Sequence, residues 1–169
     1  ALSAVCLVPD YDNLMVLRGV SKFFAAPGLR LGYGMTSNED FLNILKEYQN
    51  PWSLNRIGAF AGELFLQDTD YIQKTRQLIE TERTRIYETL QTIPELKAFK
   101  PSANFVLVQI LNEGVTSFDV FDNLIRQKLM IRDCSSFEQL DGEFIRFCIM
   151  SPEENTRLLH ALKTFFSEN

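Results

Sequence analysis

Apolar positions follow strand-like and helix-like periods in turn along the chain. Short continuous or alternating apolar runs, which predict strands, occupy residues 14–17, 29–35, 103–110, 129–131 and 144–149. Between them, apolar side chains recur on one helical face over residues 39–49, 56–66, 72–93, 118–125 and 152–166. This alternation predicts a protein of α/β or α+β class.

Helix-capping residues predict where several helices begin. Ser37 precedes the acidic pair Glu39 and Asp40 and is the expected N-cap of the helix that follows. Asn55 is the expected cap of the next helix. The stretch 151–154, Ser-Pro-Glu-Glu, places Ser at the N-cap, Pro at N1 and Glu at N3, which predicts a full capping box.

The predicted elements divide the chain near Leu66. Residues 67–169 carry enough strands and helices for a self-contained small α+β domain. Residues 1–66 carry only two strands and two helices, which make a poor core by themselves. The sequence also begins without Met, inside an α/β pattern. We therefore expect residues 1–66 to be the incomplete C-terminal portion of a larger domain.

Composition and charge narrow the class of protein. The chain has 169 residues, 46% of them hydrophobic and 23% charged, which excludes disorder, collagen and coiled coil. The net charge of −5 argues against nucleic acid or an anionic membrane as partner. No apolar run approaches the roughly 20 residues of a membrane helix. The N-terminus has no basic n-region of a secretory signal, so a cytoplasmic location is expected.

Cysteine and histidine usage limits the available chemistry. Cys6, Cys134 and Cys148 are odd in number and widely spaced, so we interpret them as free thiols and expect no metal site. The single histidine, His160, points away from the apolar stripe of the last helix and is expected to be solvated. Trp52 follows a proline in a turn and is expected to be a packing anchor.

A lysine and an arginine flank one glycine-bearing loop. Lys22 leaves a predicted buried strand, so we expect it to be partly desolvated, which lowers its pKa and favours the neutral, nucleophilic amine. Arg30 follows eight positions later and, with the Ser21 hydroxyl, can hold a phosphate. The plain alternative is a surface lysine at a strand end with a structural arginine.

The whole string from 21 to 33, Ser-Lys, five residues, then Gly-Leu-Arg-Leu-Gly-Tyr, resembles the lysine motif of the fold type I, class I/II aminotransferase superfamily. The resemblance implies that pyridoxal 5'-phosphate is the cofactor, that Lys22 forms its Schiff base, and that Ser21 and Arg30 bind its phosphate. It also implies the C-terminal part of a PLP-dependent transferase-like fold: the end of the large domain followed by the α+β small domain.

Two further arginines suit a substrate with two anionic groups. Arg132 and Arg146 lie on or beside short predicted strands, and a guanidinium can bind carboxylate or phosphate in bidentate fashion. Without the resemblance, both would be read as surface ion-pair residues. By the resemblance, Arg146 binds the substrate carboxylate and Arg132 its phosphate. Asn104 either lies near the substrate or satisfies backbone groups at its strand start.

Five stretches narrow the resemblance within the superfamily. Residues 51–55, 102–105, 131–134, 143–146 and 151–159 are most similar to L-threonine-O-3-phosphate decarboxylases, which make aminopropanol phosphate for cobalamin synthesis. Histidinol-phosphate aminotransferases are the alternative, and a non-catalytic, self-associating small domain is an alternative of another class. The resemblance implies a small phosphorylated amino acid as substrate and a homodimer of the whole protein.

The chain also departs from the family pattern. Gly19 stands where relatives often carry Ser or Thr, which removes one hydrogen bond to the cofactor phosphate. The family's phosphate loop, its stacking aromatic residue, an Asn and the Asp that pairs with the pyridine nitrogen are not found before Lys22. Because that Asp keeps the ring protonated, we expect this chain alone to be nearly or wholly inactive.

Overall fold

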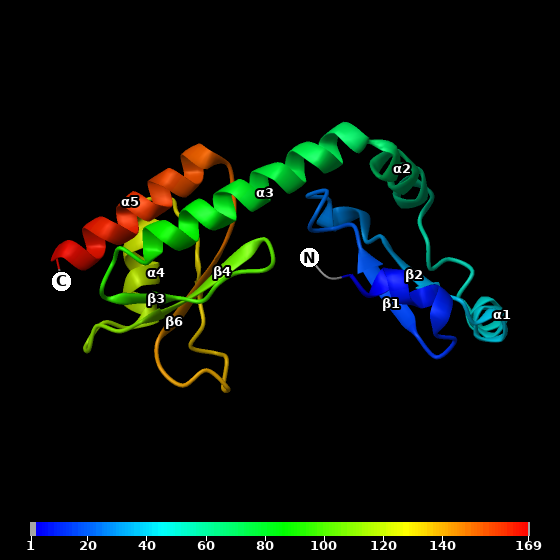
Figure 1. The fold of residues 1–169 in the computed structure, drawn as a ribbon, viewed down its shortest axis with the longest axis horizontal. Coiled ribbons are helices and arrows are strands. Elements are labelled where there is room, and N and C mark those ends of the chain that lie inside the picture. Colours follow the sequence, from blue (N-terminus) through cyan, green and yellow to red (C-terminus); the bar gives the residue numbers. More distant parts are fainter. Residues whose placement is uncertain (1–2, 169) are drawn as a thin grey trace. The chain divides into compact units, whose positions relative to one another are not determined.

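The computed structural model describes residues 3–168, which form two compact units that divide between Gln73 and Lys74 (Figure 1). The boundary between the units falls inside helix α3 (Thr69–Leu90). The boundary predicted from the sequence, near Leu66, lies a few residues earlier. The assignment of the two parts to a large and a small domain stays a prediction. Among the described residues, no helix is long and apolar enough to cross a lipid bilayer.

The first unit is built on a two-stranded antiparallel sheet. Its elements are the 3₁₀ helix η1 (Ala4–Asp10), β1 (Met15–Gly19), the 3₁₀ helix η2 (Pro27–Leu29), β2 (Gly32–Thr36), α1 (Glu39–Tyr48) and α2 (Arg56–Gln67). In the sheet, Val16 pairs with Met35 and Gly19 with Gly32. The predicted strand over 29–35 is wrong at its start, because Pro27 initiates a 3₁₀ turn.

Little of the first unit is buried. Val20 is its one buried hydrophobic residue among those described, so the poor core expected for residues 1–66 is found. Trp52 is 90% exposed, which contradicts its expected role as an anchor. It lies in a hydrogen-bonded turn in which its own N–H binds the Asn50 side chain, and that turn projects the indole outward.

Of the two N-caps predicted in this unit, the one at α2 is confirmed and the one at α1 is wrong. Asn55 caps α2 as expected, because its Oδ1 accepts a hydrogen bond from Gly58 N at 2.6 Å. Asn38, not Ser37, caps α1 by accepting from Phe41 N at 2.8 Å. The Ser37 hydroxyl instead donates to the backbone of an earlier turn.

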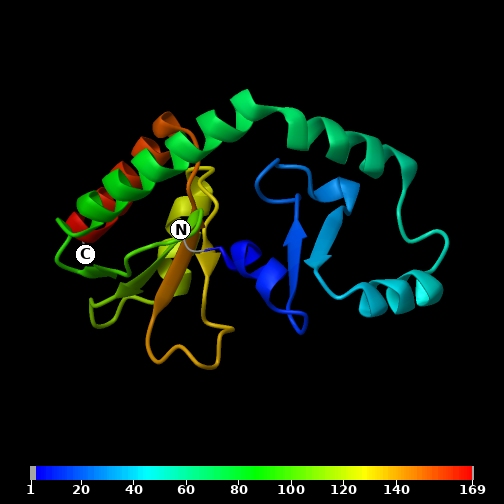
Figure 2. The same cartoon turned by 45° about the vertical axis from the view of Figure 1, so that its right-hand side comes forward.

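The second unit is a four-stranded antiparallel sheet with helices on one face (Figure 2). The strand order is β3 (Leu96–Ala98), β4 (Phe105–Ile110), β6 (Phe144–Cys148) and β5 (Arg132–Asp133). The remaining helices are α4 (Ser117–Arg126) and α5 (Pro152–Glu168). Figures 1 and 2 both show α3 and α5 side by side along the sheet.

Alternation along β4 decides which face of this sheet is buried. Val106, Val108 and Ile110 are buried beneath the helices, while Phe105 and Leu107 belong to the opposite face. The fully buried core residues are Ile86 and Leu90 from α3, Val106 and Val108 from β4, Val120 and Leu124 from α4, Ile145 from β6 and Leu162 from α5. The opposite face of the sheet carries both apolar and charged side chains, among them Arg146 opposite Leu107.

A polar network joins α3 to the start of α5. Glu82 is buried and accepts hydrogen bonds from Arg85 Nε at 2.9 Å and from Asn155 Nδ2 at 2.7 Å. Asn155 also exchanges two hydrogen bonds with the backbone of Met150, both at 2.9 Å. The network thus fixes the segment that follows β6.

The full capping box predicted at the start of α5 is wrong, and a different capping box is present at α4. Ser151 accepts from Glu154 N at 3.4 Å, as an N-cap should, but the Glu154 carboxylate binds Arg157 at 2.8 Å. The reciprocal pair of bonds is present at α4, between Thr116 and Asp119. Competition from a basic residue one turn later explains the difference at α5.

Candidate active site

The loop between β1 and β2 carries Ser21, Lys22 and Arg30, and its own hydrogen bonds give it a defined shape. Phe24 N donates to Val20 O at 3.1 Å, and Ala26 N donates to Ser21 O at 3.0 Å. Arg30 has a left-handed backbone with φ of 52°, which a non-glycine residue adopts only when its surroundings hold it there.

Helix α2 holds the Arg30 side of this loop. Asn55 Nδ2 donates to Leu29 O at 3.0 Å, so one side chain both caps the helix and binds the loop. Two glycines one turn apart allow the close approach: a Cβ at Gly58 would lie 3.1 Å from Leu29 O, and one at Gly62 would lie 2.5 Å from Leu31 Cδ2. The loop around Arg30 is therefore seated on a strip of α2 without side chains.

Aromatic side chains hold the Lys22 side of the loop. The Phe24 ring stacks on Phe65 at 4.9 Å between centroids and on Tyr71 at 5.6 Å. The Tyr71 hydroxyl donates to Phe23 O at 3.1 Å. The backbone that follows Lys22 is thus tied to α2 and to the start of α3.

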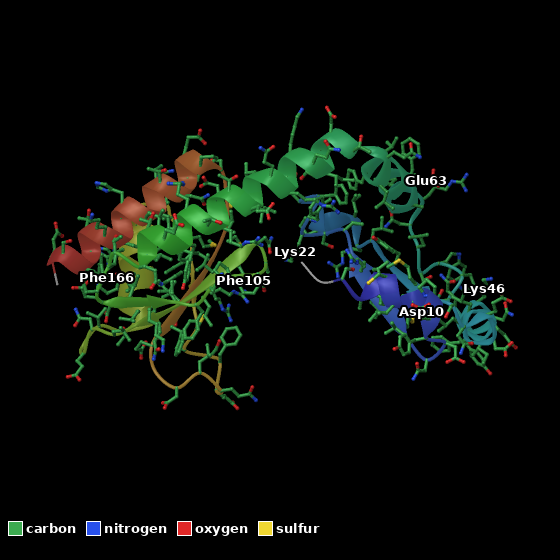
Figure 3. All side chains as sticks on the ribbon, in the orientation of Figure 1. Asp10, Lys22, Lys46, Glu63, Phe105 and Phe166 are labelled. Atoms are coloured by element: carbon green, nitrogen blue, oxygen red, sulfur yellow. The ribbon has the colours of Figure 1, made fainter. Side chains whose placement is uncertain are left out.

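The side chain of Lys22 is exposed (Figure 3). Arg30 is exposed as well, and Ser21 is half-buried. The expected burial of Lys22 is therefore wrong for this chain. The reason is that Phe24, and not Lys22, packs against Phe65 and Tyr71. Arg30 Nη1 donates to Pro27 O at 3.3 Å, which keeps its side chain at the loop.

Arg132 and Arg146 lie directly opposite each other on β5 and β6. Like charges in such a cross-strand pair repel. Each guanidinium lies over an aromatic ring, Arg146 at 5.0 Å from the Phe105 centroid and Arg132 at 5.6 Å from that of Phe137. Neither arginine forms a salt bridge with a carboxylate in the part of the chain that the structure describes. The ion-pair interpretation is therefore not what the structure supports.

A cavity of about 490 Å³ opens beside Arg146 on the sheet face away from the helices. It is lined by Phe105, Leu107, Cys134, Ser136, Phe137, Glu138, Gln139, Leu140 and Arg146. Arg132 donates to Ser136 Oγ at 3.2 Å and so contacts the cavity wall. A mostly apolar lining that includes the Arg146 guanidinium suits a small organic anion, which Glu138 opposes.

Cys134 and Asn104 have structural surroundings. Burial raises the pKa of the Cys134 thiol, although the nearby Arg146 opposes the shift, so the neutral thiol is favoured and is a poor nucleophile. The backbone carbonyl of Asn104 accepts from Ile149 N at 2.9 Å, and Asn104 is not among the residues that line the cavity. Its proposed place near the substrate stays a prediction.

Sequence patterns did not identify the residues that hold the β1–β2 loop, nor the aromatic rings beneath Arg132 and Arg146. The Gly58 and Gly62 spacing of one helical turn is a readable signal for close backbone approach. The aromatic partners of the arginines had no such signal. Pairing Phe105 with Arg146 requires the register of β4 on β6, in which Arg146 lies opposite Leu107.

Comparison with known proteins places these features in a family. The family described as aminotransferase class I and II matches residues 1–162. A putative threonine-phosphate decarboxylase from Caldanaerobacter subterraneus is 36% identical over 165 residues, which cover 98% of this chain and 44% of the relative. A histidinol-phosphate aminotransferase from Methanothermobacter thermautotrophicus is 33% identical over 156 residues, covering 92% and 42%.

A solved structure gives the same result. The histidinol-phosphate aminotransferase from Clostridium acetobutylicum superposes with a TM-score of 0.89 at 37% identity, covering 99% of this chain and 50% of that one. The chain therefore has the mixed helix and strand fold of these aminotransferases, and it spans half or less of the length of these relatives.

Proposed function

Because the chain belongs to the class I and II aminotransferase family, we propose that it supplies the lysine loop and the substrate-anion site of an enzyme that decarboxylates L-threonine O-3-phosphate. The family depends on pyridoxal 5'-phosphate. The observation that carries the proposal is the β1–β2 loop, which presents an amine, a hydroxyl and a guanidinium from one backbone segment held by α2.

The donor set of this loop fits the cofactor. Pyridoxal 5'-phosphate offers an aldehyde, for which the Lys22 amine is the matching nucleophile. It also offers a phosphate, for which the Ser21 hydroxyl and the Arg30 guanidinium are matching donors. When bound, the cofactor draws electrons from the bond that breaks at the substrate α-carbon.

The residues of this chain then have separate tasks. Lys22 would hold the cofactor through its amine, and its Nζ would move a proton at the substrate α-carbon. Ser21 and Arg30 bind the cofactor phosphate. The hydrogen bond from the Arg30 side chain to Pro27 O is long, at 3.3 Å, and exposed, so exchanging it for one to a phosphate oxygen costs little.

The second unit is proposed to bind the substrate. Arg146, which lines the cavity, binds the carboxylate, and Arg132 binds the phosphate ester. Asn104 is proposed to lie near the substrate. The orientation of the carboxylate decides which bond at the α-carbon breaks, so Arg146 is the residue on which decarboxylation depends most. The product would be aminopropanol phosphate, in service of cobalamin synthesis.

An aminotransferase acting on histidinol phosphate is the second candidate. Its support is the likeness to the Clostridium structure and to the Methanothermobacter relative. The two candidates differ in the products of the whole protein incubated with L-threonine O-3-phosphate. Carbon dioxide and aminopropanol phosphate would support the decarboxylase, and a keto product would support the aminotransferase.

Self-association without catalysis remains the candidate of another class. The first unit exposes apolar side chains, including Leu17 at 75% and Ile57 at 74%, which favour association. For the whole protein we propose a homodimer in the cytoplasm. A chain that dimerises but has no affinity for pyridoxal 5'-phosphate would support the non-catalytic candidate.

The first experiment titrates the chain with pyridoxal 5'-phosphate, reduces the product with borohydride and maps the labelled peptide. We expect the label on Lys22. It should disappear in Lys22→Ala and persist in Lys46→Ala, which removes another exposed lysine of the same unit. Label spread over many lysines, and unchanged in Lys22→Ala, would refute the assignment of Lys22.

A further inference from the structure

Three elements of the second unit meet at one buried serine. Ser117, the first residue of α4, is 1% exposed. Its hydroxyl donates to Asp133 Oδ1 at 2.8 Å, and its backbone N–H donates to Glu143 Oε2 at 2.6 Å. Asp133 directly follows Arg132 on β5, and Glu143 directly precedes β6, which carries Arg146. Ser117 therefore joins the two strands that carry the arginines.

The Asp133 carboxylate is held at both of its oxygens. Ser135 N donates to Oδ1 at 2.8 Å, and the Ser135 hydroxyl donates to Oδ2 at 2.9 Å. The carboxylates of Asp133 and Glu143 also lie at the N-terminus of α4, where the helix dipole favours negative charge. The position of Asp133 is thus fixed by hydrogen bonds to α4 and to the turn after β5.

Strand β5 needs such support. It has only two residues, Arg132 and Asp133, and its pairing with β6 puts Arg132 opposite Arg146. The two cations repel across the pair, and a strand this short has few ladder bonds to oppose them. The backbone bond from Cys134 N to Phe144 O, at 3.0 Å, adds one.

We propose that Ser117, Asp133 and Glu143 form a clamp that holds Arg132 at a fixed separation from Arg146 and so sets the affinity for a substrate with two anionic groups. The proposal rests on the proposed function for the identity of those groups. The three clamp residues are positioning residues, since Asp133 alternates with Arg132 along β5 and is directed away from the arginine face.

The charge of Asp133 and its positioning contacts predict opposite effects of Asp133→Ala on the affinity for the anion. Removing a carboxylate near two arginines raises the positive potential and should strengthen anion binding if charge alone matters. Removing a positioning contact should weaken it. Asp133→Asn separates the two, because it removes the charge but keeps an oxygen that accepts from Ser117 and Ser135.

The experiment titrates O-phospho-L-threonine into the ¹⁵N-labelled chain and follows the side-chain Nε–H signals of Arg132 and Arg146. We expect Asp133→Ala and Ser117→Ala to weaken binding by about tenfold, and Asp133→Asn to stay within about threefold of the wild type. Asp122→Ala, which removes a carboxylate of α4 that binds Arg126, is the charge-matched control and should leave the affinity unchanged.

Each other outcome has a definite meaning. Equal or tighter binding by Asp133→Ala, with the wild type binding normally, overturns the clamp and leaves the proposed function standing. A wild type whose Arg132 and Arg146 signals do not respond overturns the anion assignment itself. If Asp133→Ala does not fold, Ser117→Ala decides the question, because it keeps the backbone bond to Glu143.

Discussion

Gly62 shows how one residue without a side chain positions the lysine loop. A Cβ there would lie 2.5 Å from Leu31 Cδ2, whereas at Gly28 a Cβ would meet no atom within 4 Å. The first contact is with the end of a flexible side chain, so Leu31 must move but the backbone need not.

We predict that Gly62→Ala destabilises the first unit by about 1 kcal/mol, because displacement of Leu31 outweighs the better helix propensity of alanine. Gly28→Ala should be nearly neutral. Urea denaturation followed by circular dichroism measures both. A midpoint for Gly62→Ala equal to that of wild type would contradict this, because the cost of moving Leu31 would then not exceed the gain in helix propensity.

Glu82 gives the second unit a pH-dependent stability. The hydrogen bond from Arg85 holds the pKa of Glu82 below its usual value of 4.5, with a smaller contribution from Asn155, although burial works in the opposite direction. A carboxyl whose pKa is lower in the folded state stabilises the protein above its unfolded pKa and loses that contribution as the pH falls.

The free energy of unfolding should therefore decrease as the pH falls below about 4.5. Glu82→Gln should be less stable near neutral pH and should show a shallower decrease over the same range. Glu88→Gln, which changes an exposed residue of the same helix, should keep the wild-type profile. Urea denaturation at a series of pH values provides the data. A Glu82→Gln profile parallel to wild type would contradict the argument.

At the scale of elements, helix α2 holds the β1–β2 loop, which carries Lys22, through a direct hydrogen bond. The chain offers a matched pair of asparagine caps: Asn55 caps α2 and also binds Leu29 O, while Asn38 caps α1. Loss of either cap should cost its helix about 1 kcal/mol. Only loss of Asn55 should disturb the cofactor site.

We therefore predict that Asn55→Ala reduces borohydride-trapped pyridoxal 5'-phosphate on Lys22 at subsaturating cofactor, while Asn38→Ala leaves it unchanged. Peptide mapping quantifies the label in both variants. Equal labelling would show that the bond to Leu29 O does not contribute to the shape of the loop.

Sequence patterns predicted long elements better than short ones. The helical recurrence of apolar residues over 72–93 predicted α3, and the apolar run over 103–110 predicted β4. Strand β3 was missed, and the strand predicted over 129–131 is wrong, because the strand lies at 132–133 as β5. Strands of three or fewer residues carry no measurable period. Their place in the sheet comes from pairing with distant residues, which local sequence does not encode.

At the scale of the whole molecule, the two units differ in how much they bury. The second unit has a continuous hydrophobic core, while Val20 is the one buried hydrophobic residue described in the first. Amides in β1 and β2 should therefore exchange with solvent much faster than those in β4 and β6. Hydrogen exchange read by NMR tests this. Equal protection in the two sheets would mean that association or a ligand stabilises the first.

The family could be predicted from the β1–β2 loop because all the residues of the lysine motif lie within thirteen consecutive positions, 21 to 33. The arrangement of Arg132 and Arg146 could not, since it depends on strand register, and the exposure of Lys22 depends on where Phe24 packs. Residues that act together within one loop are readable from sequence, whereas residues joined by tertiary pairing are not.

Because Trp52 is exposed, it can serve as an intrinsic fluorescence probe of the turn that carries it. It is the single tryptophan of the chain and is 90% exposed, so we expect it to fluoresce as an indole in water does. Unfolding of the second unit leaves that environment as it was, and the signal reports only on the turn between α1 and α2. Anything that covers this turn, whether a second copy or another part of the whole protein, moves the emission to shorter wavelength.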